Sequence, residues 1–181
     1  MDDIGLPHSG WGTGTVPVEH GPNGDVTLLE SRSGFFSAFQ LYGVIDTPDK
    51  LEQGGMLLTH STGGHRARAI VPKQYTHIRV EKSLLSALTR WKIGFRASDA
   101  LPKLGKRAEG DHPDVLRYTG GRTTLRLEAG EGYIHLTHRS LTGGQKTELH
   151  DASGPLRGTV ELPGPGLIEV DCLVPWSVTV R

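Results

Sequence analysis

The chain contains nine histidines, and the histidine side chain can act as a metal ligand or as an acid or base. His60 and His65 flank a Gly-Gly turn, and His135 lies in a segment of alternating polar and apolar residues. Imidazole binds zinc and other transition metals, and a carboxylate such as Asp151 would complete a mixed ligand set. One hypothesis is therefore a metal site built from His60, His65 and His135. Surface or hydrogen-bonded histidines are the alternative, because no H-x-H, H-E-x-x-H or paired-cysteine spacing gives zinc a local signature.

Two other groups of residues carry potential metal ligands. His135 and His138 are three residues apart in a predicted strand, so their side chains point to opposite faces unless a bulge intervenes. Asp111-His112-Pro113-Asp114 offers oxygen ligands to calcium, but a charged turn ahead of a strand is the simpler interpretation.

Arginines also cluster in one predicted strand. Arg66 and Arg68 are two residues apart and therefore share a strand face. With His65 and Lys73 they predict a basic patch that binds an anionic ligand. An ordinary solvated face is the alternative interpretation.

The sequence has no recognisable signature of catalysis. It contains no G-x-S-x-G nucleophile elbow, no P-loop and no dinucleotide-type glycine run between a strand and a helix. Cys172 lies near an apolar run without an evident histidine partner, so we interpret it as a small buried hydrophobe and not as a nucleophile. We predict no catalytic residue and no cofactor.

Charge and hydropathy exclude several classes of partner. Lys plus Arg and Asp plus Glu number 20 each, which gives a formal net charge of zero and removes the usual electrostatic footprint of a nucleic-acid binder. No apolar stretch is long enough to cross a bilayer, and no signal peptide is visible. The single cysteine excludes an internal disulfide. The expected location is the cytoplasm, with signal-independent export left open.

The apolar residues predict an all-β fold with at most one short helix. The chain contains 25 Gly and 11 Pro, and its apolar residues occur in short alternating runs separated by turn residues. Phe35, Phe39, Leu41 and Ile45, for example, recur at even spacing, as on one face of a strand. Ser83–Leu88 has the spacing of a single helical turn.

Composition divides the chain into four parts. Residues 1–24 are a Gly/Pro-rich arm, 25–96 a first β unit, 97–111 a polar linker and 112–181 a second β unit. Within the arm, Trp11 is expected to cap the core of the chain, and an exposed contact for a partner is the alternative.

The two units match each other in order, which predicts an internal duplication. The matched pairs of segments are Thr27-Leu28 with Thr124-Leu125, Gly34-Phe35-Phe36 with Gly132-Tyr133-Ile134, Arg66–Pro72 with Arg157–Pro163, Ile78–Glu81 with Ile168–Asp171, and Leu88–Arg96 with Leu173–Arg181. We therefore predict an antiparallel β-sandwich architecture of two tandem, pseudo-twofold-related units. Trp91 and Trp176 are predicted core anchors, with ligand-stacking platforms as the alternative.

The second unit also carries a recurring pattern. Its segments are Tyr118–Gly121, Gly132-Tyr133-Ile134, Gly154–Val160, Gly166–Val170 and Trp176–Val180. This half resembles small, largely uncharacterised β-sandwich modules of bacterial proteins, although it departs from them at Leu156 and Val174-Pro175. The resemblance implies a fold and little about activity.

Together these patterns favour a non-catalytic binding or interaction module whose ligand is a carbohydrate or a protein surface. A structural subunit of a larger assembly, such as a homo-oligomer joined through the arm and an edge strand, is the second hypothesis. A small metal-dependent enzyme that uses the histidines is the third.

Overall fold

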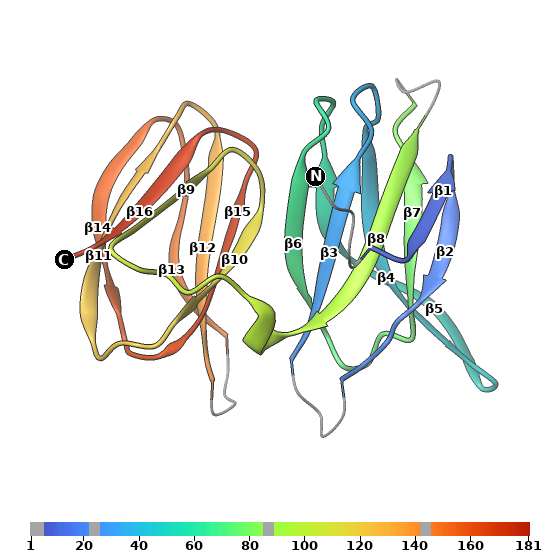
Figure 1. Cartoon of the computed structure of the whole chain (residues 1–181), viewed down its shortest axis with the longest axis horizontal. Helices are drawn as coiled ribbons and strands as arrows, with labels where there is room; N and C mark the ends of the chain where they lie inside the picture. The colour runs from blue at the N-terminus through green and yellow to red at the C-terminus, as the bar shows by residue number, and fades with distance from the viewer. Residues whose placement is uncertain (1–5, 22–25, 85–88, 142–145) are drawn as a thin grey trace. The chain divides into compact units, whose positions relative to one another are not determined.

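The computed structural model describes residues 6–21, 26–84, 89–141 and 146–181, which form two compact units, Met1–Ala100 and Leu101–Arg181 (Figure 1). Both consist of antiparallel strands, which confirms the predicted all-β sandwich class built from two similar units. The helical turn predicted over Ser83–Leu88 falls mainly on residues outside the described part. In the described residues the helical element is a 3-10 turn, η2 (Ser98–Ala100), and no helix is long and apolar enough to span a membrane.

The first unit contains two four-stranded sheets. One has the order β1 (His8–Trp11), β8 (Arg90–Ala97), β3 (Thr27–Ser33) and β6 (Arg66–Val71), and the other has β2 (Gly14–Pro17), β7 (His77–Lys82), β4 (Phe39–Thr47) and β5 (Lys50–His60). This order, 1-8-3-6 against 2-7-4-5, is that of a jelly roll. The predicted N-terminal arm is therefore part of both sheets, because β1 pairs with β8 and β2 pairs with β7.

The second unit repeats the same strand order. Its sheets are β9 (Arg107–Gly110), β16 (Trp176–Val180), β11 (Thr123–Ala129) and β14 (Leu156–Leu162), and β10 (Asp114–Tyr118), β15 (Gly166–Cys172), β12 (Tyr133–Ser140) and β13 (Thr147–Ser153). Each strand corresponds to the strand eight places earlier. The predicted linker 97–111 thus contains η2 and β9, and β9 pairs with the final strand.

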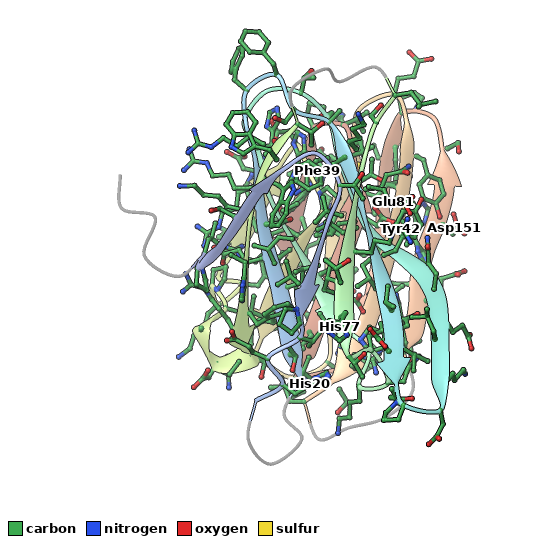
Figure 2. The ribbon with its side chains drawn as sticks, turned by 90° about the vertical axis from the view of Figure 1, so that its right-hand side faces the viewer. His20, Phe39, Tyr42, His77, Glu81 and Asp151 are labelled. Atoms are coloured by element: carbon green, nitrogen blue, oxygen red, sulfur yellow. The ribbon has the colours of Figure 1, made fainter. Side chains whose placement is uncertain are left out.

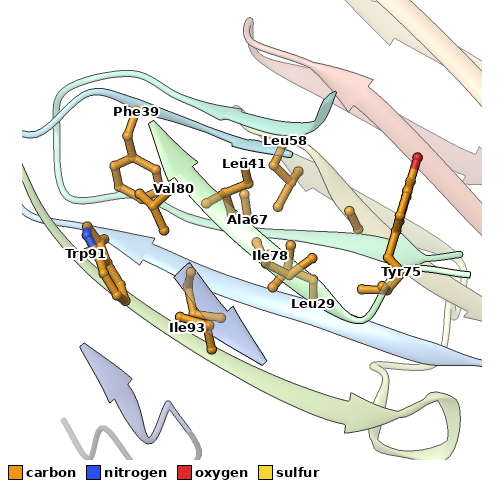
Figure 3. Close-up of a cluster of buried hydrophobic side chains, with 13 residues drawn as sticks. Leu29, Phe39, Leu41, Leu58, Ala67, Tyr75, Ile78, Val80, Trp91 and Ile93 are labelled. Carbon is orange, nitrogen blue, oxygen red and sulfur yellow. The ribbon is translucent and has the colours of Figure 1, made fainter. Parts of the chain in front are cut away.

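Alternate side chains of both sheets in each unit point inward and form its core. In the first unit Leu29 and Ile93 come from one sheet, and Leu41, Ile78 and Val80 come from the other (Figure 3). The second unit has its own cluster, which includes Leu125, Leu127, Leu136, Ile168 and Val178. Each unit therefore has the separate core that an independent domain requires.

A tryptophan packed on a glycine joins the first and last strands of each unit. In the first unit Trp91 lies opposite Gly10, where a Cβ atom would overlap the indole ring. The Trp91 Nε1–H donates to the carbonyl of Gly12 at 3.0 Å. The large ring is thus buried while its polar atom is satisfied, as a buried tryptophan requires.

The second unit repeats this contact. Trp176 lies opposite Gly110, and its Nε1–H donates to the carbonyl of His112 at 2.9 Å. Both tryptophans belong to the hydrophobic clusters of their units. The carbonyl acceptor lies two residues after the glycine in each unit, so the two units correspond in side-chain detail as well as in topology.

Strand pairing places three of the five matched segments in equivalent positions. The equivalent residues are Arg66 and Arg157, Ile78 and Ile168, and Trp91 and Trp176. The match of Thr27-Leu28 to Thr124-Leu125 is wrong by one residue. Ser33 lies opposite Trp91 and Ala129 lies opposite Trp176, so Ser33 and Ala129 are equivalent. This register makes Thr27 equivalent to Thr123.

The match of Gly34-Phe35-Phe36 to Gly132-Tyr133-Ile134 is also wrong. Leu41 and Leu136 occupy equivalent places, and so Phe39 is the counterpart of Ile134. Phe35 and Phe36 are exposed in the turn before β4. Phe35 lies in the turn that connects β3 of one sheet to β4 of the other, at a spacing that continues the apolar alternation of β4. An apolar pattern does not distinguish such a turn residue from a residue of the strand.

The Trp–Gly contact leads to a stability prediction. Gly110→Ala should lower the free energy of unfolding by about 1–3 kcal/mol, because overpacking forces neighbours out of their rotamers, and the added carbon would lie 2.7 Å from the Trp176 ring. Gly105→Ala is the matched control, since nothing lies within 4 Å of a Cβ there. Urea unfolding followed by tryptophan fluorescence measures both variants. Equal midpoints would contradict the close contact.

Candidate functional site

The outer face of the β1-β8-β3-β6 sheet is strongly basic. Since successive side chains of a strand alternate between faces, the residues that flank the inward Trp91 and Ile93 point outward. The outward cationic residues of this sheet are Arg32, Arg66, Arg68, Arg90, Lys92 and Arg96. Glu30 is the only carboxylate among the described residues of the same face. We call this surface the basic face.

Glu30 holds three of these arginines together. Its side chain is only 5% exposed, and its carboxylate lies 2.5 Å from Arg66 Nη2, 3.5 Å from Arg68 Nε and 3.4 Å from Arg96 Nε. A buried carboxylate is costly unless cations compensate its lost hydration. Glu30 therefore organises the end of the basic face that includes Arg68 and Arg96.

The other end of the basic face contains a hollow. A cavity of about 370 Å³ is lined by Arg32, Ser33, Gly34, Arg90, Trp91 and Lys92. The Arg90 guanidinium also lies over the Trp11 ring, 5.6 Å from its centroid. Trp11 is 64% exposed, so the expectation that it caps the core is wrong. Trp11 points outward because Gly10, its neighbour, takes the inward place against Trp91.

The second unit has a hollow at the equivalent place. Its cavity of about 740 Å³ includes Glu128, Ala129, Gly130, Pro175, Trp176 and Ser177, the counterparts of the six residues above. Gly34 N donates to the Arg90 carbonyl at 2.9 Å, and Gly130 N donates to the Pro175 carbonyl at 2.9 Å, which confirms the correspondence. The common fold therefore accounts for the hollow in both units, and the side chains that line each hollow determine its charge.

The two hollows differ in charge. Arg32, Arg90 and Lys92 of the first are replaced by Glu128, Pro175 and Ser177 in the second. The arginines around the second hollow are balanced by carboxylates. Those ion pairs are Arg107–Glu109, Arg126–Glu128 and Arg157–Glu128. A concentration of cations is thus a property of the first unit alone, and the jelly roll does not require it.

The predicted basic patch coincides only in part with this surface. Arg66 and Arg68 share the outer face, as their spacing indicated. His65 lies in the turn before β6, where its backbone N–H donates to Ser33 Oγ at 3.1 Å, and Lys73 lies in the turn after β6. The residues that line the hollow were missed. Arg90-Trp91-Lys92 carried the signal, since an inward tryptophan turns both neighbours outward.

The three histidines predicted as metal ligands lie in different settings. His60 and His65 belong to the first unit and His135 to the second. His60 is buried, its Nε2 lies 2.6 Å from Ser31 Oγ, and its ring packs on Phe39 at 4.6 Å. Ser31 and His60 come from opposite sheets, so this hydrogen bond joins the two layers inside the core.

Other histidines form structural hydrogen bonds. His20 Nε2 lies 2.8 Å from the Tyr75 carbonyl, and His77 Nδ1 lies 2.9 Å from Thr76 Oγ1 (Figure 2). In the Asp111–Asp114 turn, Asp114 accepts from the N–H of Val115 at 2.8 Å. These contacts support the structural interpretation of His20, His77 and the turn.

His135 is placed beside two carboxylates. It lies opposite Asp151 on β13, and its Nε2 lies 3.5 Å from Glu148 Oε2. Ligand atoms of His135, Glu148 and Asp151 all lie within 4.8 Å of one another. Asp171 lies opposite His135 on the other neighbouring strand, β15. Burial raises the pKa of the Asp171 carboxyl, and the charge of His135 partly offsets this shift.

Cys172 has the environment of an inert thiol. Its side chain is buried in the second core, and its Sγ–H donates to the Val174 carbonyl at 3.4 Å. Burial raises the pKa of this thiol above its ordinary value. The fraction of reactive thiolate is therefore reduced.

No protein-family model matches the chain, and no curated protein matches it significantly.

Removal of the buried charge tests the role of Glu30. Glu30→Gln should lower the free energy of unfolding by about 3 kcal/mol, because it leaves three arginines without their shared counter-ion in a partly desolvated place. Glu52→Gln is the control, because its ion pair with Lys50 is exposed and should contribute less than about 1 kcal/mol. Chemical denaturation provides the comparison. A loss for Glu30→Gln no larger than the control would show that the arginines do not depend on Glu30.

Thiol labelling tests the environment of Cys172, the only cysteine in the chain. Iodoacetamide should modify the native protein far more slowly than the denatured protein, because both burial and the raised pKa disfavour attack. Mass spectrometry over time measures the two rates. Rapid labelling without denaturant would mean that Cys172 is accessible.

Proposed function

We propose that the protein is a non-catalytic binding module that binds an acidic carbohydrate at the hollow of the basic face. One observation carries this proposal: equivalent hollows occur in both units, and only the first is lined by Arg32, Arg90 and Lys92. Because the common fold does not require these cations, their concentration in one unit indicates a ligand of opposite charge.

The side chains around the hollow suit an acidic sugar. Arginine presents a planar fork of donors that pairs with a carboxylate or sulfate group in a bidentate manner. Trp11 offers an exposed aromatic surface beside Arg90, so the apolar face of a sugar ring could stack there while its anionic substituent reaches the cations. The cavity of about 370 Å³ is within the usual range of small-ligand sites.

Overall charge argues against nucleic acid as the ligand. The formal net charge of zero provides no long-range attraction for a polyanion with closely spaced charges. A short acidic saccharide needs only the local cations of the hollow. The basic face therefore favours recognition of a few anionic groups.

Short oligosaccharides of polygalacturonate and of heparin, with neutral dextran oligosaccharides as the uncharged comparison, are suitable probes of this proposal, and calorimetry measures their binding to the full chain. Both acidic glycans should bind and dextran should not. Arg90→Ser should weaken binding by about tenfold or more, since a charge-assisted hydrogen bond contributes about 1.5–3 kcal/mol. Trp11→Ala should weaken binding without altering its salt dependence, because the indole carries no charge.

Arg107→Ser is the matched control for Arg90→Ser. Arg107 lines the equivalent hollow of the second unit and is half-exposed. It should leave the affinity for either acidic glycan unchanged. Equal losses in the two variants, or binding of dextran as tight as that of the acidic glycans, would overturn the proposal. Tighter binding of a single-stranded oligonucleotide than of either acidic glycan would assign the face to nucleic acid instead.

A further inference from the structure

We propose that His135, Glu148 and Asp151 form a binding site for one divalent transition-metal ion on the second unit. The site lies on the outer face of the β10-β15-β12-β13 sheet and does not depend on the proposed glycan binding. It keeps His135 and Asp151 from the ligand set that the sequence suggested and adds Glu148 of the strand that carries Asp151.

The distances fit a metal ion. Two ligand atoms about 2.1 Å from one ion at a tetrahedral angle are separated by about 3.4 Å. His135 Nε2 and Glu148 Oε2 are 3.5 Å apart, and the ligand atoms of all three residues lie within 4.8 Å of one another. Glu148 and Asp151 are exposed, so small rotations of their side chains would complete the coordination.

A bulge brings the two carboxylates to the same face. In a regular strand Glu148 and Asp151, three residues apart, would point to opposite faces. The pairing of β12 with β13 shifts register between Leu136 and Thr137, so that Leu149 is an extra residue in β13. Glu148 therefore lies opposite Thr137 and Asp151 opposite His135, on one face.

The first unit has the same bulge without the ligands. The pairing of β4 with β5 shifts register between Leu41 and Tyr42, which leaves Leu57 as the extra residue. The counterparts of His135, Glu148 and Asp151 are Gln40, Met56 and Thr59. Thr59 Oγ1 lies 3.2 Å from Met56 Sδ, so the bulge brings these two places into contact in the first unit as well.

The two units therefore share the bulge but differ in the residues that occupy it. The jelly roll supplies the bulge in both units, but only the second unit fills its three places with an imidazole and two carboxylates. Structural demands of the bulge therefore do not explain the ligand set.

The imidazole nitrogen itself also points to a ligand. His135 Nε2 is inaccessible to solvent, and it has no hydrogen-bond partner of good geometry among the described residues. Its contact with Glu148 Oε2 at 3.5 Å is an ion pair without good hydrogen-bond geometry. A buried polar atom without a hydrogen bond is unfavourable, and a coordinated ion would satisfy it. Imidazole favours zinc and related transition metals, whereas an all-oxygen set would favour calcium or magnesium.

The chain contains a matched pair for a control. His8 Nε2 lies 3.2 Å from Glu19 Oε1, with side chains 26% and 62% exposed, compared with 25% and 63% for His135 and Glu148. His8 and Glu19 belong to no such three-residue group within the first unit among the described residues. A difference between the two histidines would therefore reflect what His8 lacks, which is a second carboxylate such as Asp151 and a buried Nε2 without a hydrogen bond.

Calorimetric titration of the full, untagged chain with Zn²⁺ and with Mn²⁺ tests the site. At least one of the two ions should bind with a stoichiometry of one per chain. His135→Gln, which introduces the first-unit residue, should weaken that binding at least tenfold, and His8→Gln should change it less than twofold. If His135→Gln alters the circular dichroism spectrum, Asp151→Asn, an exposed and nearly isosteric change, serves in its place.

Three results would overturn the assignment. They are no saturable binding of either ion, binding that is insensitive to His135→Gln and Asp151→Asn, and equal losses for the His135 and His8 variants. Glycan affinity measured in the same His135→Gln variant should stay at the wild-type value, so the two proposals can fail separately.

Discussion

The packing of an indole on a glycine is the contact on which each unit depends. Trp91 and Trp176 lie in the last strands of their units and fill the space left by Gly10 and Gly110 in the first strands. A side chain at either glycine would compete with the ring for that space. The indole N–H reaches a carbonyl two residues beyond the glycine, so burial of the ring leaves no unpaired donor. First and last strands are thereby joined, and the neighbouring outward residues take fixed places.

The Trp–Gly contact explains which residues differ between the two units. Residues beside the inward tryptophan must point outward and are free of the core, so their identity can change without loss of the fold. In the first unit these outward places carry Arg90 and Lys92, and in the second Pro175 and Ser177. The bulges of β5 and β13 follow the same rule: the backbone geometry is shared by the two units, and the outward side chains differ. One scaffold thus presents a cationic hollow in one unit and a histidine–carboxylate group in the other.

The cations of the basic face divide into two groups, one at each end. Glu30 is the shared counter-ion of Arg66, Arg68 and Arg96 at one end, where its carboxylate is buried. Arg90 at the other end packs on the exposed ring of Trp11. The predicted patch of Arg66 and Arg68 therefore lies at the end that Glu30 organises, and the ligand site that we propose lies at the hollow.

The sequence by itself determined the all-β class, the similarity of two halves and the burial of Trp91 and Trp176, because these follow from local alternation and from ordered matches along the chain. It also placed Arg66 and Arg68 on one face. Tertiary structure alone decided that residues 8–17 belong to the sheets, that Trp11 is exposed, and that Glu148 lies beside His135 and Asp151. The reason is that strand pairing, register and bulges depend on contacts between distant segments. A shift of one residue reverses every side chain, and a local pattern does not specify that shift.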